Sequence, residues 1–269
     1  MARTCIFCEN EGNLSKEHLW PDWLSKMYIR KGDEKHNFGS QTYLDKKMIN
    51  DGVYQRPGHL FSLKNRVVCQ TCNNGWMSEV ENETKPILIR MINGEKHKIT
   101  CDELNQLSFW IAMKVVTAEF AQKNETLDVT PLNERRAMME ERKIPTFFNL
   151  FLGVHSTGHN SAWYRHSWTM SLSKKGPNPP LEGRQRNAQS IAFILGPIFI
   201  YVLNVRLNGF VPEEYFKFGN MKRLHPSKRH FLRWPQKPLR KVESDIIAFM
   251  SHDLIESNNV KFVPEMPGL

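Results

Sequence analysis

Cys69-Gln70-Thr71-Cys72-Asn73-Asn74-Gly75-Trp76 decides the organisation of this chain, together with Cys5-Ile6-Phe7-Cys8 near its start. Each stretch carries two cysteines in a Cys-x-x-Cys pair, and four thiolates in two such pairs suit one tetrahedral Zn²⁺. The pairs are separated by 60 residues, so a shared metal would fasten the start of the chain to the start of a later helix. We therefore predict a structural zinc held by Cys5, Cys8, Cys69 and Cys72. Reduced thiols without metal remain an alternative, and a thioredoxin-like pair would need a βαβ setting.

A second pattern, Glu17-His18, follows the first cysteine pair. Hydrolysis of a phosphodiester needs a base that activates water, a cation that stabilises developing charge, and an imidazole held in one tautomer. His18 can act as the base, and Glu17 can ligate Mg²⁺ or a similar ion. Asparagine amide oxygens such as those of Asn65 and Asn73 are suitable further ligands. The dipeptide and the asparagines together predict a reactive site beside the zinc.

The order Cys-x2-Cys, acid-His, Asn and Cys-x2-Cys-Asn resembles the zinc-knuckled branch of the HNH endonucleases, also called His-Me finger or ββα-metal nucleases. The resemblance implies a β-hairpin followed by a helix, a structural Zn²⁺ and a catalytic Mg²⁺ or Mn²⁺. It also implies that His18 is the general base, Glu17 the acidic metal ligand, Asn65 a brace for the base's loop and Asn73 a metal ligand at the start of the helix. Further candidate ligands are Asn74, His36 and His59.

The resemblance covers only the N-terminal part of the chain, and it extends to a subset of bacterial HNH proteins with a large C-terminal domain. Some members of that subset resemble nucleases of phage-defence systems, so the resemblance implies a role in phage defence or restriction. DNA rather than RNA is the expected substrate, on the resemblance alone. One HNH site cuts one strand at a time, so cleavage of a duplex would suggest a homodimer.

A basic tract supports a nucleic-acid partner independently of these motifs. The chain has a net charge of +9, and nine of its 37 Lys and Arg residues lie between residues 217 and 241, which leaves 28 to balance its 28 Asp and Glu residues. Aromatic residues are interleaved with these cations, a combination that favours phosphate contact and base stacking. A solvated basic surface, or one paired with acids elsewhere in the fold, is the alternative. The predicted nucleic-acid contacts are Lys222, Arg223, Lys228, Arg229, Arg233, Lys237, Arg240 and Lys241, and Lys217 completes the tract.

The order of helical and strand patterns predicts an α+β fold with two domains. Residues 1–95 would form the ββα-metal module with the four-cysteine zinc site, and residues 96–269 an α+β domain that carries the basic tract. Expected helices cover residues 21–31, 74–83, 102–121 (capped by Asp102), 131–143 and 245–256. Expected strands cover residues 66–68, 147–154, 162–172, 190–195 and 198–205, and residues 32–58 form a loop or an inserted hairpin.

Cysteines used as metal ligands indicate a reducing compartment, and no apolar leader precedes Cys5. The longest apolar run, residues 191–205, is too short to span a bilayer and reads as buried strand. We therefore expect a cytoplasmic protein without a membrane partner. Two further hypotheses stay open. The chain could bind nucleic acid without cutting it, or it could be a zinc-stabilised sensor whose C-terminal domain binds a regulatory ligand or partner near Trp163, Trp168 and Phe199.

Overall fold

The computed structural model forms two compact units, each assembled from separate segments of the chain. The first unit comprises Met1–Asn37, Gln55–Thr146 and Ser227–Pro235, and the second comprises Phe38–Tyr54, Phe147–Pro226 and Gln236–Leu269. The structure describes residues 4–27, 35–44, 47–51, 54–57, 64–120, 129–155, 162–168, 187–206, 210–214 and 217–239.

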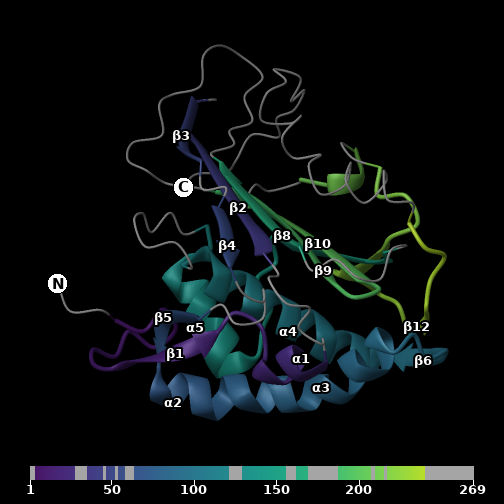
Figure 1. The fold of residues 1–269 in the computed structure, drawn as a ribbon, viewed down its shortest axis with the longest axis horizontal. Helices are drawn as coiled ribbons and strands as arrows, with labels where there is room; N and C mark the ends of the chain where they lie inside the picture. Colours follow the sequence, from purple (N-terminus) through teal and green to yellow (C-terminus); the bar gives the residue numbers. More distant parts are fainter. Residues whose placement is uncertain are drawn as a thin grey trace. The chain divides into compact units, whose positions relative to one another are not determined.

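The first unit is organised around two paired strands and the helix that follows them (Figure 1). Strand β1 (Leu14–His18) pairs antiparallel with β5 (Lys64–Cys69). Helix α2 (Gln70–Cys72) begins directly after β5 and runs through a π-type turn, η2 (Asn73–Met77), into α3 (Ser78–Ile92). The second cysteine pair therefore lies where β5, the partner of β1, passes into the helix.

Helix α3 extends well beyond residue 83, where the predicted helix ended, and Pro86 lies inside it. Its buried side chains recur at helical spacing, and the helix packs along α4 (Cys101–Glu119). Packing of an apolar face stabilises a helix more than local propensity does. The buried side chains of α3 are Val80, Thr84, Ile87, Leu88 and Met91.

Helix α4 is the central helix of the first unit. Every residue from Leu107 to Glu119 is buried, so the helix is enclosed on all sides rather than along one stripe. The predicted cap was wrong: Thr100, not Asp102, is the N-cap. The Thr100 hydroxyl accepts from the Glu103 backbone N–H at 3.3 Å, and the Glu103 carboxylate accepts from the Thr100 N–H at 2.8 Å. This reciprocal capping box satisfies two donors at the helix start.

Two further helices and a second pair of strands complete the first unit. Helix α1 (Asp22–Met27) follows β1, and α5 (Leu132–Glu141) follows α4. Strand β6 (His97–Thr100) pairs antiparallel with β12 (Phe231–Trp234), which comes from the far end of the described chain. Both strands contact α4. The unit therefore depends on a segment that the sequence places long after its other parts.

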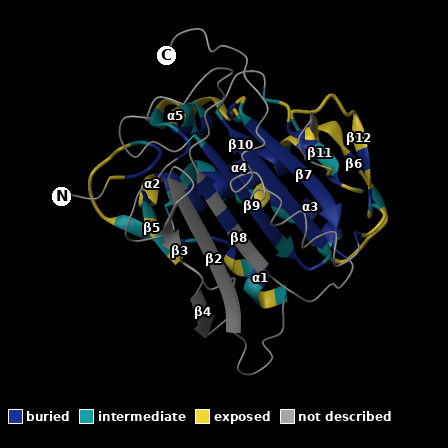
Figure 2. Ribbon diagram, turned by 90° about the horizontal axis from the view of Figure 1, so that it is seen from above, coloured by how far each residue is buried: buried dark blue, intermediate teal, exposed yellow. Residues whose placement is uncertain are grey.

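The second unit is built on a mixed sheet whose strand order is β11-β7-β10-β9-β8-β2-β3, with β4 (Tyr54–Pro57) also paired to β2. Strands β2 and β8 are parallel, and the neighbours β7–β10, β10–β9, β9–β8, β11–β7 and β2–β3 are antiparallel. Figure 2 shows β7, β9 and β10 buried along their lengths. The remaining bounds are β2 (Lys35–Leu44), β3 (Lys47–Asp51), β7 (Phe148–Val154), β8 (Ala162–Trp168), β9 (Ala188–Leu195), β10 (Ile198–Val205), the 3-10 turn η3 (Pro212–Glu214) and β11 (Lys222–His225).

The chain is thus a mixed α/β protein, consistent with the predicted α+β class. The strands that the sequence indicated between residues 147 and 205 are present, and residues 32–58 contribute β2, β3 and β4. The structure places residues 96–146 with the first unit, whereas the sequence analysis divided the chain after residue 95. The reason is packing, since α4 lies against α3. The helix expected over residues 245–256 lies outside the described residues.

None of the helices in the described part of the chain combines the length and the apolar character that crossing a membrane requires.

Candidate functional site

The four cysteines of the two Cys-x-x-Cys pairs come together in the first unit, and their Sγ atoms all lie within 4.8 Å of one another. The Sγ atoms of Cys8 and Cys69 are 3.6 Å apart. Zn–S bonds of about 2.3 Å in a tetrahedron would separate the sulfurs by about 3.8 Å, so the cluster has the dimensions of such a site. Cys5 and Cys72 are buried, and Cys8 and Cys69 are half-buried. The cluster can therefore hold a structural metal such as zinc.

Backbone contacts bring the two pairs together. The Ile6 N–H donates to the Val67 carbonyl at 3.0 Å, which ties the first pair to β5. The Cys72 N–H donates to the Cys69 Sγ at 3.4 Å. This one hydrogen bond caps the start of α2 and also holds the two cysteines of the second pair close together. Phe7 then packs edge-on to Trp76, with ring centroids 4.9 Å apart.

The thiols of the cluster differ in acidity. A hydrogen bond with Cys72 lowers the pKa of Cys5 to about 4, and the same interaction raises the pKa of Cys72. Burial raises the pKa of Cys8. Crowded thiolates repel one another, and a divalent cation at their centre removes that repulsion. The cluster is therefore a set of groups that a metal would ionise together.

Strands β1 and β5 bring three of the predicted site residues together. Glu17 lies directly opposite Asn65, and His18 lies opposite Lys64. Residues opposite each other in an antiparallel pair share one face of the sheet, and neighbours along a strand face opposite sides. Glu17 and Asn65 therefore share the inner face, where Glu17 is 5% exposed. The Asn65 Nδ2 is buried without a hydrogen-bond partner.

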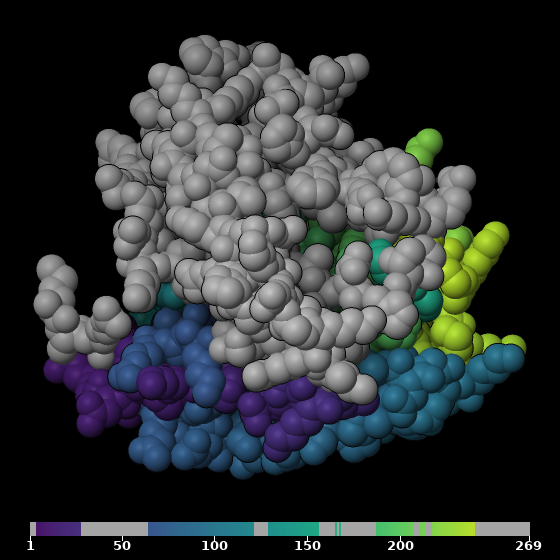
Figure 3. All heavy atoms as spheres, in the orientation of Figure 1, coloured from purple at the N-terminus to yellow at the C-terminus, as the bar shows by residue number. Residues whose placement is uncertain are grey.

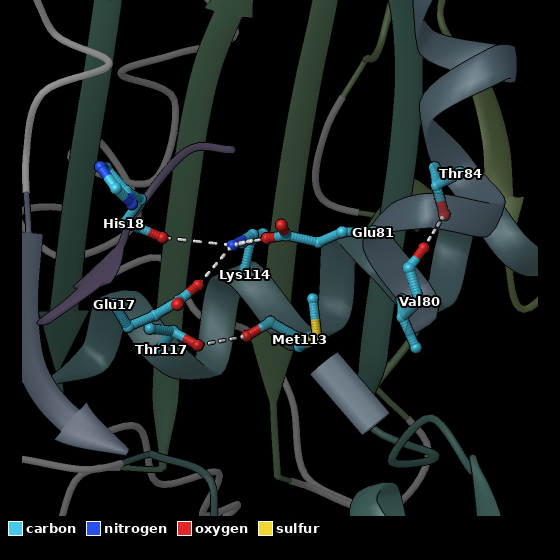
Figure 4. A network of polar contacts seen from close by, with 8 residues as sticks. All are labelled: Glu17, His18, Val80, Glu81, Thr84, Met113, Lys114 and Thr117. Carbon is cyan, nitrogen blue, oxygen red and sulfur yellow. Dashed lines mark hydrogen bonds and ion pairs between the residues drawn. The ribbon is translucent and has the colours of Figure 1, made fainter. Parts of the chain in front are cut away.

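The Glu17 carboxylate meets a buried lysine that the sequence analysis did not consider. Lys114, on α4, is fully buried, and its Nζ lies 2.9 Å from the Glu17 Oε1. Nζ also pairs with Glu81 of α3 and donates to the His18 carbonyl oxygen at 3.2 Å. Figure 4 shows the ammonium between the two carboxylates and the His18 backbone. One side chain thus ties β1 to both long helices.

Burial alone would lower the pKa of Lys114, but the opposite charges of Glu81 and Glu17 and their hydrogen bonds raise it above its ordinary value. The lysine is therefore a permanent cation. Two acidic side chains thus contact one buried ammonium.

His18 projects its ring away from this charged group (Figure 4). Its Nε2 lies 3.5 Å from the Asp22 Oδ1, and a quarter of its side chain is exposed. Partial burial lowers the pKa of His18, and the charge of Lys64 lowers it further, against the opposing effects of Asp22 and Glu17. The imidazole is therefore neutral at pH 7, the state in which a histidine accepts a proton.

Asn73 lies at the beginning of the helix, directly after Cys72, in the turn η2. Gly75 departs from helical geometry in this turn, with φ −91° and ψ −116°. Arg142 stabilises the turn, since its Nη1 donates to the Trp76 carbonyl at 2.9 Å and its Nη2 to the Glu79 Oε2 at 2.7 Å. Irregular turns of this type within helices often occur at functional sites. Asn74 is in the same turn, whereas the side chains of His36 and His59 lie outside the described part.

The basic tract is divided between the two units. Lys228, Arg229 and Arg233 belong to the first unit, whereas Lys217, Lys222, Arg223 and Lys237 belong to the second. Arg223 pairs with the Glu213 Oε2 at 2.9 Å and donates to the Asn149 Oδ1 at 2.9 Å, so its guanidinium serves the packing of its own unit. Arg240 and Lys241 lie outside the described residues.

Comparison with protein-family models, with curated proteins and with solved structures finds no match to this chain.

Sequence reasoning missed three residues that contact the candidate site: Asp22, Glu81 and Lys114. Lys114 carried a usable signal, because it interrupts the apolar run Trp110-Ile111-Ala112-Met113-Lys114-Val115-Val116. A lysine enclosed in such a run is almost never buried unless it is paired. The identity of its partners could not be read from the sequence, since Glu17 and Glu81 lie on other elements.

Proposed function

We propose that this chain is a metal-dependent endonuclease of the HNH type that hydrolyses phosphodiester bonds in nucleic acid, with DNA as the expected substrate. The observation that carries the proposal is the pairing of β1 with β5, which sets Glu17 and His18 opposite Asn65 and Lys64. The same strand β5 leads into the cysteine cluster and the helix that begins there. The residues proposed as base and acidic ligand therefore lie on the strand that pairs with β5, which leads into the cysteine cluster.

In the proposed mechanism, His18 takes a proton from the attacking water. Its lowered pKa keeps the ring neutral and ready to accept that proton. Asp22, near the Nε2, holds the ring and stabilises the imidazolium that forms. The Glu17 carboxylate and the Asn73 amide would hold a divalent cation such as Mg²⁺ or Mn²⁺. That cation would stabilise the charge on the phosphate and the leaving oxygen.

Glu17 is the residue on which this assignment depends most. Its Oε1 is bound by Lys114, so it would ligate the cation through its second oxygen. Glu81 supplies the additional negative charge that lets Lys114 and a cation share one neighbourhood. Cys5, Cys8, Cys69 and Cys72 would hold Zn²⁺ as a scaffold and take no part in the reaction, because four protein ligands leave no open position.

The test is cleavage of supercoiled plasmid with Mg²⁺ or Mn²⁺, comparing the wild type with His18→Ala. We expect loss of activity by a factor of about 10² to 10⁴, the contribution of a general base. Both proteins should carry the same amount of zinc, which checks that the variant is folded. Equal cleavage by the two proteins would refute the catalytic role of His18.

The burial of Glu17 against Lys114 favours a second candidate function, a zinc-stabilised protein that binds nucleic acid without cutting it. In that case the ion pair between Glu17 and Lys114 only stabilises the fold, and Glu17 binds no metal ion. A gel shift that persists without added divalent metal, together with no cleavage by any metal, would establish this second function in place of the first.

A further inference from the structure

Strands β6 and β12 form a two-stranded ribbon in the first unit whose two faces differ completely. We call residues 96–100 and 228–234 the basic ribbon. Figure 3 shows the yellow-green atoms of β12 beside the blue atoms of β6 at the lower right of the molecule.

The inner face of the basic ribbon is anchored in the core. Ile99 is fully buried, and Leu232 and Trp234 are 4% and 2% exposed. The Trp234 Nε1 donates to the Met91 carbonyl at 3.0 Å, near the end of α3. Because side chains alternate along a strand, this anchoring fixes which residues of the ribbon face outward.

The outer face gathers positive charge from two distant parts of the sequence. Arg233 lies directly opposite Lys98, and both are exposed. Exposed cations at the ends of the strands extend the face: Lys96, Lys228 and Arg229, with His230 beside them. Glu95 adjoins the ribbon and accepts a hydrogen bond from Asn93 at 3.2 Å.

An exposed aromatic ring lies within this charged face. Phe231 is 41% exposed, and the only other large hydrophobic side chain so exposed in the described part of the chain is Val211. The Lys98 Nζ lies 4.2 Å from the centroid of the Phe231 ring. A ring flanked by cations is the combination with which proteins stack an unpaired base and hold the phosphates on either side of it.

We propose that the basic ribbon binds unpaired nucleotides of a nucleic acid, with Phe231 stacking on a base and Lys96, Lys98, Lys228, Arg229 and Arg233 contacting the backbone. The proposal rests on the proposed function for its choice of nucleic acid as the polyanion. It adds the surface that binds the nucleic acid and specifies that the bound segment is single-stranded. Lys96 and Lys98 lie outside the basic tract of residues 217–241, whereas Phe231 is one of the aromatic residues interleaved with that tract. A base pair inside a duplex is stacked on both sides and has no free face for this ring, whereas an unpaired base has one.

The test measures binding of a fluorescent 20-nucleotide single strand, without added Mg²⁺ and in a His18→Ala background that prevents cleavage. We expect Phe231→Ala to weaken binding about tenfold and Phe231→Tyr to bind like the parent, because a tyrosine also stacks. The double variant K96Q/K98Q should lower the slope of log affinity against log salt by about 0.7 for each phosphate that the protein no longer neutralises. Binding of the same strand in a blunt duplex should depend much less on residue 231, because every base pair except the two at the ends is stacked on both sides.

Two matched control variants distinguish binding at the basic ribbon from a general loss of hydrophobic surface or positive charge. Val211→Ala removes the other exposed large hydrophobic side chain, and Lys143→Gln removes an exposed lysine just after α5. Both should bind like the parent. The proposal is overturned if Phe231→Ala binds like the parent, or if the controls lose as much affinity as the ribbon variants. It is also overturned if polyglutamate or phosphatidylserine vesicles bind the ribbon and the oligonucleotide does not.

The outcomes for the ribbon and for the nuclease are distinguishable. If plasmid is cut and residue 231 has no effect on binding, the ribbon proposal fails and the nuclease stands. If no metal supports cleavage but the ribbon variants weaken binding as expected, the nuclease fails and the ribbon stands.

Discussion

Lys114 places one ammonium between two carboxylates where water does not reach it. Replacing it with methionine would keep the volume but leave Glu17 buried beside an apolar side chain. Removing one partner of a buried ion pair costs about 3 kcal/mol, because the remaining charge is uncompensated. We expect Lys114→Met to lower the free energy of unfolding of the first unit by about that amount, measured by urea denaturation.

The matched control for this prediction is Lys143→Met, which changes an exposed lysine and should alter stability by less than about 0.5 kcal/mol. A triple variant, K114M with E17Q and E81Q, should recover part of the loss because the stranded charges are gone. If K114M is as stable as the wild type, the ion pairs contribute nothing and Lys114 is a spacer.

At the scale of single residues, the cysteine cluster could be predicted from the sequence, whereas the contacts around Glu17 and His18 could not. The Cys-x-x-Cys spacing predicted a cluster that the structure assembles, because the two pairs carry their geometry locally. The sequence singled out the Glu17-His18 dipeptide, but the residues around it come from α4 and α3. No local sequence pattern indicates that these helices lie against β1. The roles of Glu17, His18, Asn65 and Asn73 therefore stay predictions.

Among the elements, the start of α4 makes a measurable prediction. Thr100 and Glu103 satisfy each other's backbone N–H groups, and Glu103 also pairs with Arg90. Thr100→Ala removes one half of the capping box and should cost about 1 kcal/mol of stability, measured by thermal unfolding. Asp102→Ala, at the position that the sequence suggested as the cap, should cost less.

The same capping box gives stability a dependence on pH. Burial opposes ionisation of Glu103, but the hydrogen bonds from Thr100 and the charge of Arg90 lower its net pKa below the ordinary value of 4.5. A carboxyl group with a lowered pKa in the folded state contributes stability above 4.5, and this contribution is lost as the pH falls through the folded pKa.

We therefore expect the difference in unfolding free energy between the wild type and Glu103→Gln to be largest near pH 7. It should shrink between about pH 5 and pH 3. Urea titrations of both proteins at several pH values measure it. A constant difference across this range would show that the ionised form of Glu103 has no preference for the folded state.

Elements with strong patterns were predicted well, and boundaries set by packing were not. The strands β7, β9 and β10 are mostly apolar and are buried on both faces, so they could be predicted from the local sequence alone. The predicted helix ended at residue 83, but α3 continues through Pro86 because its buried face packs on α4. Pairing of β6 with β12 joins residues too far apart for a local pattern to indicate.

For the whole molecule, metal content provides the broadest test. If the four cysteines hold one zinc, purified protein should contain one zinc per chain, measured by elemental analysis. Chelation should lower the melting temperature of the first unit, since the binding free energy of a structural zinc is part of the folding free energy. Cys5→Ser should lower both the zinc content and the melting temperature. Cys101→Ser should change neither, because Cys101 is exposed and outside the cluster. Full stability of Cys5→Ser without zinc would argue against a structural metal.

The first unit depends on residues 231–234, which the ribosome makes only after most of the second unit. During synthesis, β6 therefore has no partner strand, and Ile99 has no residue opposite it until Leu232 emerges. A chain released early, for example at residue 146, would present an open strand edge to chaperones and to other nascent chains. The four cysteines would all be synthesised long before the first unit could close, so an unfinished first unit would lack the stability of the complete one.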